Sequence, residues 1–381
     1  MLKFSFWLLL GLILWTYVGY PILLKLLAAV RRQRITLLPT EPSCTLVITA
    51  YNEERSIADK LANSLALDYP REKLQILVAS DCSTDRTHEI VEGFADQGIE
   101  LMVLENRGGK TAAQNAAVKR ARGEIVIFTD ASTEFSPETI RSLLLPFSDP
   151  RVGCVGAELD YVSDEGSGIG KGAGAYWRYE KRVKSLEAAV SSLIGVSGCL
   201  YAVRTSLYTE ISPDMISDFV IASEIYAKGY LTVYANGAVS KEKTLENTGQ
   251  EFNMRVRVAI RSVNALIRYA HMLNPFRYGF FAVQLLSHKV IRYLVPELLI
   301  ALLAVHVAIV LRGNAPFYQW LLVGHLAVYA AALIGWGTHV AGVKLPLLHI
   351  PFYFMQVNAA AFWALLRYIQ GERKTIWTPI R

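Results

Sequence analysis

Two aspartates stand at the ends of short apolar runs that are typical of buried β-strands. Asp81 follows the run at 74–79, and Asp130 follows the run at 125–129. Ligands of an open parallel sheet bind beyond the carboxyl ends of its strands, so both carboxylates are expected at one edge of the sheet. Helix capping accounts for the polar residues in the turns that follow, but less well for an aspartate at the strand end itself. We therefore predict functional roles for Asp81 and Asp130.

Asp130 has a chemical use that Lys110 complements. A hard divalent cation needs carboxylate oxygens, and the diphosphate of a nucleotide sugar supplies further oxygens to the same ion. Such a metal, Mg²⁺ or Mn²⁺, also acts as a Lewis acid for a departing nucleoside diphosphate. Lys110, in the segment NRGGKT, can pair with phosphate; this segment is not a nucleotide-hydrolysing P-loop, because that motif needs glycine in place of Leu104.

The elements that must position these residues alternate between strand and helix patterns from 43 to about 236. Such alternation specifies a parallel sheet that is covered on both faces, so we predict an α/β fold with a Rossmann-like, mostly parallel sheet. The glycine-rich stretch 165–174 is predicted to be a mobile loop within this domain. Strands are expected at 45–49, 74–79, 101–104, 125–129, 153–159, 199–204 and 231–234, with early helices near 53–67, 85–97 and 110–122.

The chain also carries segments that predict a membrane protein. Its hydrophobic content of 52% and mean hydropathy of +0.29 are too high for an ordinary soluble enzyme. Residues 4–30 contain one charge, Lys25, and are long enough to cross a hydrocarbon core of about 30 Å. The arginines that follow, at 31, 32 and 34, belong in the cytosol by the positive-inside rule. We therefore expect the N-terminus outside and the chain after residue 34 inside.

The C-terminal third divides into interfacial and spanning segments. The basic helical stretch 252–269 and the stretch 276–291 are expected to lie along the membrane surface, with His288 and Lys289 as headgroup anchors. Crossings are predicted at 294–311 and 318–340, and 345–366 is expected to be re-entrant or interfacial because the basic tail after it belongs in the cytosol. The predicted units are an N-terminal membrane helix (1–34), a catalytic domain (43–250), interfacial helices (251–292) and a C-terminal membrane region with a cytosolic tail (293–381).

The distribution of charge and the spacing of the cysteines limit the classes of binding partner that we expect. The net charge is +6, but the basic residues cluster partly beside apolar segments, so we expect membrane lipids as partners and no nucleic acid. No close cysteine pair suggests zinc or redox chemistry, and reduced structural thiols are expected. The oligomeric state is left open.

Four motifs together carry a family resemblance. The segments TAYNE (49–53), DCSTD (81–85), GGKTAAQN (108–115) and FTDAS (128–132), in this order and spacing, resemble family-2 glycosyltransferases, among them cellulose, chitin and hyaluronan synthases. The resemblance covers roughly 43–260 and the tail 377–381. It implies a GT-A fold and inverting transfer of a sugar from a nucleoside diphosphate, UDP by preference, to a lipid-linked or polysaccharide acceptor. It also implies an integral protein of a bacterial-type inner membrane with a cytoplasmic catalytic domain.

The resemblance assigns roles around the donor. Asp130 would bind the metal, but the family often has Asp-x-Asp where this chain has Asp130-Ala131-Ser132, so Ser132 replaces the second carboxylate or another group completes the site. Lys110 would sit near the uracil or the diphosphate. The nucleoside pocket would include Ala50, Tyr51, Glu53 and Asp81, and the diphosphate would contact Arg255 and Arg257, for which lipid contact is the alternative.

The acceptor side is assigned in the same way. Gly198, Cys199 and Tyr201 resemble the acceptor-site strand of the family, and Trp177 either stacks on an acceptor sugar or only packs. Asp218 stands where the family keeps its catalytic aspartate. Inversion in a single displacement needs one base to take the proton of the acceptor hydroxyl, so Asp218 is the predicted base; capping of the following helix is its alternative role.

Three other functions compete with this one. Processive synthases carry Gln-x-x-Arg-Trp before the membrane, whereas Gln250 and Arg255 have the wrong spacing here and no tryptophan lies between Trp177 and Trp320. Addition of one or a few sugars is therefore favoured. A non-catalytic scaffold is supported only by the missing second carboxylate. A transporter is disfavoured because the polar residues of the membrane segments lie near their ends.

Overall fold

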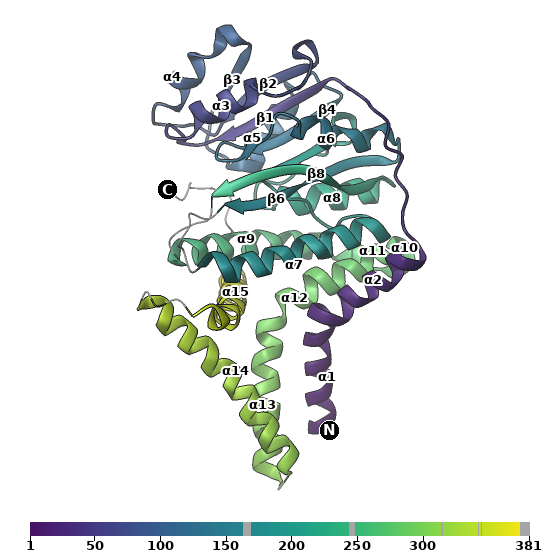
Figure 1. The fold of residues 1–381 in the computed structure, drawn as a ribbon, viewed down its shortest axis with the longest axis vertical. Coiled ribbons are helices and arrows are strands. Elements are labelled where there is room, and N and C mark those ends of the chain that lie inside the picture. The colour runs from purple at the N-terminus through teal and green to yellow at the C-terminus, as the bar shows by residue number, and fades with distance from the viewer. Residues whose placement is uncertain (163–168, 244–247, 314, 342, 344, 374–381) are drawn as a thin grey trace.

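The computed structural model describes residues 1–162, 169–243, 248–313, 315–341, 343 and 345–373. A sheet with flanking helices lies above a layer that contains α7 and α9, and apolar helices extend from this layer on the side away from the sheet (Figure 1). The helices are α1 (Leu2–Leu14), α2 (Tyr20–Val30), α3 (Ile57–Leu65), α4 (Thr87–Glu92), α5 (Lys110–Val118), α6 (Thr139–Leu144), α7 (Ile169–Val190), α8 (Ser217–Ala227), α9 (Thr248–Arg268), α10 (Pro275–Tyr278), α11 (Phe280–Leu285), α12 (Ile291–Tyr293), α13 (Val295–Arg312), α14 (Pro316–Val340) and α15 (Pro346–Ile369).

The described strands form one mixed sheet in the order β3-β2-β1-β4-β7-β6-β8-β5. Strands β1 to β4 pair in parallel, β7 runs antiparallel to both β4 and β6, and β8 runs parallel to β6. The predicted α/β fold is confirmed, but parallel pairing is continuous only in its first half. The strands are β1 (Cys44–Ala50), β2 (Leu74–Ser80), β3 (Ile99–Val103), β4 (Ile125–Asp130), β5 (Glu134–Phe135), β6 (Val152–Val162), β7 (Leu200–Arg204) and β8 (Leu231–Lys243).

The sheet is buried on both faces. Every residue of β1 and β2 is buried, as expected of central parallel strands whose sequences are nearly continuous apolar runs. Because side chains alternate between faces along a strand, Leu46 and Ile48 pack toward α3 and α6, while Val47 packs with Ala113 of α5 and Phe219 of α8. This packing fixes the strand ends, and with them the loops that follow β1, β2 and β4.

The glycine-rich stretch is partly helical. Residues 165–168 of the predicted loop lie outside the described residues, but 169–174 form the first turns of α7, so the prediction of a loop is wrong for them. The helix α7 packs against α2 and α15. Helices gain most of their stability from such tertiary packing, which offsets the cost of about 1 kcal/mol for each glycine in a helix interior.

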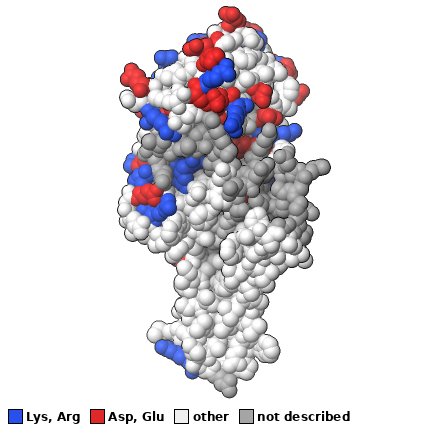
Figure 2. Space-filling view, turned by 90° about the vertical axis from the view of Figure 1, so that its left-hand side faces the viewer, with Lys and Arg blue, Asp and Glu red and all other residues white. Residues whose placement is uncertain are grey.

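Three helical segments are long and apolar enough to cross a membrane: Leu2–Val30, Val295–Arg312 and Pro316–Val340. A π-helical turn at Trp15–Gly19, followed by Pro21, bends the first of them (Figure 1). The helix α15 packs against α9 and α14 instead. Figure 2 shows that charged side chains gather on the sheet domain and are sparse on the lower part of the visible face.

Candidate active site

A cavity of about 1280 Å³ lies between the carboxyl ends of the strands and the layer formed by α7 and α9. It collects residues that are far apart in the sequence. Most of the predicted site residues line it, namely Glu53, Lys110, Asp130, Ser132, Trp177, Gly198, Cys199, Asp218, Arg255 and Arg257. Ala50, Tyr51, Asp81 and Tyr201 are not among its lining residues.

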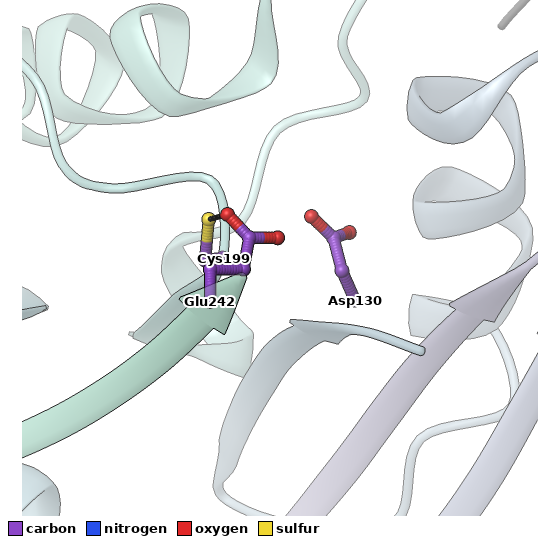
Figure 3. Close-up of side chains that lie close together, drawn as sticks. All are labelled: Asp130, Cys199 and Glu242. Atoms are coloured by element: carbon purple, nitrogen blue, oxygen red, sulfur yellow. Dashed lines mark hydrogen bonds between the residues drawn. The ribbon is translucent and has the colours of Figure 1, made fainter. Parts of the chain in front are cut away.

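Asp130 is joined at the cavity by a second carboxylate that the sequence does not reveal. Asp130 ends β4, Glu242 lies near the end of β8 and Cys199 immediately precedes β7, and their ligand atoms all lie within 4.8 Å of one another (Figure 3). The Cys199 thiol donates to Glu242 Oε2 at 3.0 Å. Ser132 Oγ donates to Glu242 Oε1 at 3.3 Å. Glu242 therefore stands where the Asp-x-Asp pattern leaves a carboxylate missing.

The side chains of Asp130, Glu242 and Ser132 are suitable ligands for a hard divalent cation. Burial and the charge of Asp130 raise the pKa of Glu242, so a cation between the two carboxylates would relieve their repulsion. Burial, together with Glu242 and Asp130, also raises the pKa of the Cys199 thiol well above its ordinary range, which keeps the sulfur a neutral, poor ligand. Two carboxylates and the Ser132 hydroxyl suit Mg²⁺ or Mn²⁺ better than a thiolate-seeking metal.

Two cations stand beside these carboxylates. Lys110 begins α5; its ammonium pairs with Asp130 and donates to the Gly198 carbonyl at 3.0 Å. Burial lowers the pKa of Lys110, but Asp130, Cys199 and Glu242 together more than offset it, and the net pKa is raised. Burial also lowers the pKa of Arg257, and Asp130 acts against it. The site thus combines acidic oxygens for a cation with cationic groups for the phosphates that would share it.

The loops after β1 and β2 are built around Asp81. Its carboxylate is 2% exposed and accepts hydrogen bonds from the backbone nitrogens of Gly108 at 2.7 Å and Gly109 at 2.9 Å. The Arg107 guanidinium lies 3.6 Å from the centroid of the Tyr51 ring. Ala50 is buried at the end of β1. Asp81 therefore holds the glycine turn that precedes Lys110, and contact of Asp81, Tyr51 or Ala50 with a nucleoside stays a prediction.

Asp218 faces the same cavity from the first turn of α8. The capping position of α8 is occupied by Ile216, with no side-chain capping bond, so neither Ser217 nor Asp218 caps this helix. A Cβ placed on Gly198 would lie 3.4 Å from Asp218 Oδ2 and 3.6 Å from Lys110 Nζ. Gly198 thus lets the carboxylate and the ammonium approach one another. This arrangement supports the role of base over that of a cap.

Several expectations need correction. Tyr201 is fully buried on β7, where its ring lies 4.9 Å from that of Phe128, so it cannot touch an acceptor. Trp177 does line the cavity, with its ring 4.7 Å from that of Tyr161. Glu224 of α8 accepts a hydrogen bond from the Tyr269 hydroxyl at 2.5 Å.

Basic residues that were expected at the membrane surface also interact with other residues of the protein. Arg255 pairs with Glu251 at 2.9 Å and also contacts the Tyr353 hydroxyl. His288 is buried between Glu187 and a second glutamate, so its assignment as a headgroup anchor is wrong. Lys289 lines the cavity. The amphipathic pattern of these helices therefore reflects packing within the protein, and contact with lipid stays a prediction.

Comparison with known proteins relates part of the chain to a described family. Residues 45–208 match the model of "Glycosyl transferase family 2". Over 100 residues, 26% of this chain and 17% of the relative, the chain is 37% identical to a poly(ribitol-phosphate) beta-N-acetylglucosaminyltransferase of Staphylococcus aureus strain Mu50. Over 234 residues, 59% of this chain and 55% of the relative, it is 27% identical to a poly-beta-1,6-N-acetyl-D-glucosamine synthase of Staphylococcus aureus strain COL. The chain thus spans about half or less of the length of these relatives.

One solved structure matches nearly the whole chain. A mannosyltransferase from Pyrobaculum calidifontis, solved with GDP-mannose and Mn²⁺, superposes with a TM-score of 0.72 at 22% identity and covers 98% of this chain and 100% of that one. The likeness confirms the predicted GT-A-type fold, with its apolar helices.

Proposed function

We propose that the protein transfers a sugar from a UDP-sugar to a membrane-associated acceptor with inversion of configuration. The match of residues 45–208 to the model of family-2 glycosyltransferases supports this proposal. The single observation that carries the proposal is the cavity in which Asp130, Glu242, Lys110 and Asp218 converge. Transfer of radiolabelled sugar from a nucleotide donor into membrane lipid by the purified protein tests it.

The residues divide the reaction between donor and acceptor. Lys110 and Arg257 would bind the donor diphosphate, and Asp130, Glu242 and Ser132 would hold Mg²⁺ or Mn²⁺, which supplies charge neutralisation for the leaving nucleotide. Asp218 would accept the proton of the acceptor hydroxyl. The hydroxyl oxygen then forms the bond to the anomeric carbon as the bond to the diphosphate breaks, and UDP leaves with the electron pair.

The donor sugar is proposed from the relatives. Both matched Staphylococcus aureus proteins are named for N-acetylglucosamine, so UDP-N-acetylglucosamine is the first donor to test. The alternative of a non-catalytic scaffold rested on the missing second carboxylate of the Asp-x-Asp pattern. Because Glu242 brings a second carboxylate close to Asp130, this argument for a scaffold is weakened.

A substitution at Glu242 tests its place in the metal site. We expect Glu242→Gln to raise the Mn²⁺ concentration that gives half-maximal activity by about tenfold or more, because one of two carboxylate ligands is replaced by a neutral amide. The matched control is Glu158→Gln on β6, whose carboxylate pairs with Lys181 instead. An unchanged metal requirement in Glu242→Gln would remove Glu242 from the site.

We propose that the catalytic domain and the end of α15 share the cytosolic side of a bacterial-type inner membrane, with the N-terminus outside. The arginines after the first apolar helix and the three candidate spans support this. In spheroplasts, a cysteine introduced as Gly313→Cys should react with a membrane-impermeant maleimide, and Gly371→Cys should react only after lysis. The parent chain, with its four native thiols, gives the background. Labelling of Gly371→Cys from outside would reverse the assignment.

A further inference from the structure

The cavity extends from the donor residues toward the membrane helices. At that end its wall includes Lys184 of α7, Lys289 of the π-helical turn Leu286–Val290, Tyr17 of the first apolar helix and Asn358 of α15. The same π-helical turn is hydrogen-bonded to the first apolar helix: Trp15 Nε1 donates to Ser287 Oγ at 3.0 Å. This end of the cavity therefore lies where the candidate spans meet the catalytic domain.

Two lysines at this end lack acidic partners. Lys184 and Lys289 are both half-buried, and within the described part of the chain neither ammonium has a hydrogen bond or an ion pair. Lys289 Nζ lies 5.7 Å from the centroid of the Phe219 ring. Burial lowers the pKa of Lys184, and the positive charge of Lys289 lowers it further against the charges of nearby acids. Two like charges held together out of water are unfavourable unless an anion joins them.

The neighbouring glutamates are committed to other groups. Glu187 accepts from the Tyr20 hydroxyl at 2.5 Å and bonds His288 Nδ1 at 2.8 Å. Glu180 pairs with Arg292 at 2.5 Å and contacts His288 Nε2 at 3.3 Å. Glu180 and Glu187 thus direct their carboxylates at Arg292, His288 and Tyr20. Within the described part of the chain they act on Lys184 through their charges, without a hydrogen bond or ion pair to it.

The two lysines lie near Asp218, at a different point from Lys110. A Cβ placed on Gly195 would lie 3.7 Å from the Asp218 carbonyl oxygen and 4.0 Å from Lys289 Nζ, so the ammonium borders the start of α8. The charge of Asp218 also acts on Lys184. Lys110, by contrast, approaches the catalytic carboxylate across Gly198. The predicted base thus has cationic groups near it at two points, Lys110 at one and Lys184 with Lys289 at the other, and the donor diphosphate is assigned to Lys110.

We propose that Lys184 and Lys289 bind a phosphate carried by the acceptor, and that the acceptor is an anionic membrane lipid whose reacting hydroxyl lies close to that phosphate. The inference rests on the proposed function and names its acceptor class. The walls contributed by Tyr17 and Asn358 place the site at the level of the membrane helices, where a lipid headgroup can enter. The lipid phosphate is unchanged in the reaction. The separate hydroxyl of the lipid gives its proton to Asp218, and the hydroxyl oxygen bonds the anomeric carbon as UDP leaves with the electron pair of the broken bond.

Fractionated lipids and lysine variants test this inference. Membrane lipid extract separated by anion exchange into neutral and anionic fractions is offered to the full-length protein with radiolabelled UDP-sugar. We expect label only in the anionic fraction. Lys184→Gln and Lys289→Gln should each raise the half-saturating concentration of that fraction by about 10- to 100-fold, because each removes hydrogen bonds to a charged group. UDP affinity should stay near wild type, and Lys184→Arg and Lys289→Arg should retain most of the acceptor affinity.

Controls distinguish a lipid phosphate from free inorganic phosphate. They also distinguish failure of the acceptor inference from failure of the proposed function. Lys119→Gln, a surface lysine paired with Glu210, controls for loss of one positive charge. Dioctanoyl phosphatidylglycerol should compete with the anionic fraction far better than dioctanoylglycerol or inorganic phosphate. Equal competition by inorganic phosphate would exclude a lipid-specific site. Label in neutral lipid, or unchanged acceptor affinity in both glutamine variants, would overturn the inference while leaving the proposed function intact. Failure to bind UDP or to transfer to either fraction would instead refute the proposed function.

Discussion

Asp218→Asn is expected to lower the turnover of sugar transfer by about 10²- to 10⁴-fold while UDP affinity stays near that of the wild type. The amide cannot accept the acceptor proton, but it keeps the size and the hydrogen-bonding edge of the carboxylate. Asp218 approaches Lys110 across Gly198, and the donor residues come from other strands and loops. The loss should therefore appear in kcat and not in nucleotide binding.

The same helix offers a matched control. Glu224 lies two turns further along α8, contacts Tyr269 and does not line the cavity. Glu224→Gln should transfer sugar at close to the wild-type rate. If Asp218→Asn also does so, Asp218 is not the base, and the proton must pass to another acid of the cavity.

Asp130→Ala is expected to abolish metal-dependent transfer. Charge neutralisation by a divalent cation is worth several kcal/mol in the transition state, which corresponds to at least about a hundredfold in rate. The substitution also removes the partner of Lys110, so binding of Mn²⁺ in the presence of UDP should fall together with turnover. Both quantities are measurable, by Mn²⁺ titration and by steady-state transfer assays.

Asp160→Ala on the neighbouring strand β6 serves as the control for Asp130→Ala. Its carboxylate pairs with Lys181 and is not among the cavity-lining groups. Metal requirement and turnover should be near those of the wild type. Undiminished transfer by the wild type in excess chelator would show that the reaction needs no metal, and the carboxylate pair would then need another role.

The local parts of this site could be predicted from the sequence, because each lies at the end of a strand or in the segment that follows one. Asp130 ends the central strand β4, and Lys110 begins the helix α5 that follows the edge strand β3. The topology of a parallel sheet brings these segments to one edge. Glu242 could not be found in this way. It reaches Asp130 through the pairing of β8 with β6 and of β6 with β7, and no local pattern encodes that order.

The predicted contact of Tyr201 with an acceptor fails for a different reason. Its position in a family motif suggested contact with an acceptor, but it lies on β7 between buried neighbours, and its side chain points into the core beside Phe128. The alternation of side chains along a strand gives each residue one face, and which face meets the cavity depends on the covering helices. Only the structure supplies that information.

The membrane end was predicted least well. Periodicity identified basic amphipathic helices, and lipid contact is the usual partner of such helices. It could not show that Glu180 and Glu187 of α7 would meet Arg292 and His288, because these residues are about a hundred positions apart. Once those ion pairs are formed, Lys184 and Lys289 remain, which is the feature from which the acceptor class is inferred.

The central claim is that this cavity transfers sugar from a nucleotide to a membrane acceptor. Its most direct test incubates the purified full-length protein with Mn²⁺, membrane lipid extract and, one at a time, radiolabelled UDP-N-acetylglucosamine, UDP-glucose, UDP-galactose and GDP-mannose. We predict organic-extractable label from a UDP-sugar, first of all UDP-N-acetylglucosamine, and its loss in Asp218→Asn. Label from GDP-mannose alone would correct the nucleotide, and label that persists unchanged in Asp218→Asn would contradict the proposed base. No transfer from any donor, together with no binding of UDP or GDP, would contradict the account as a whole.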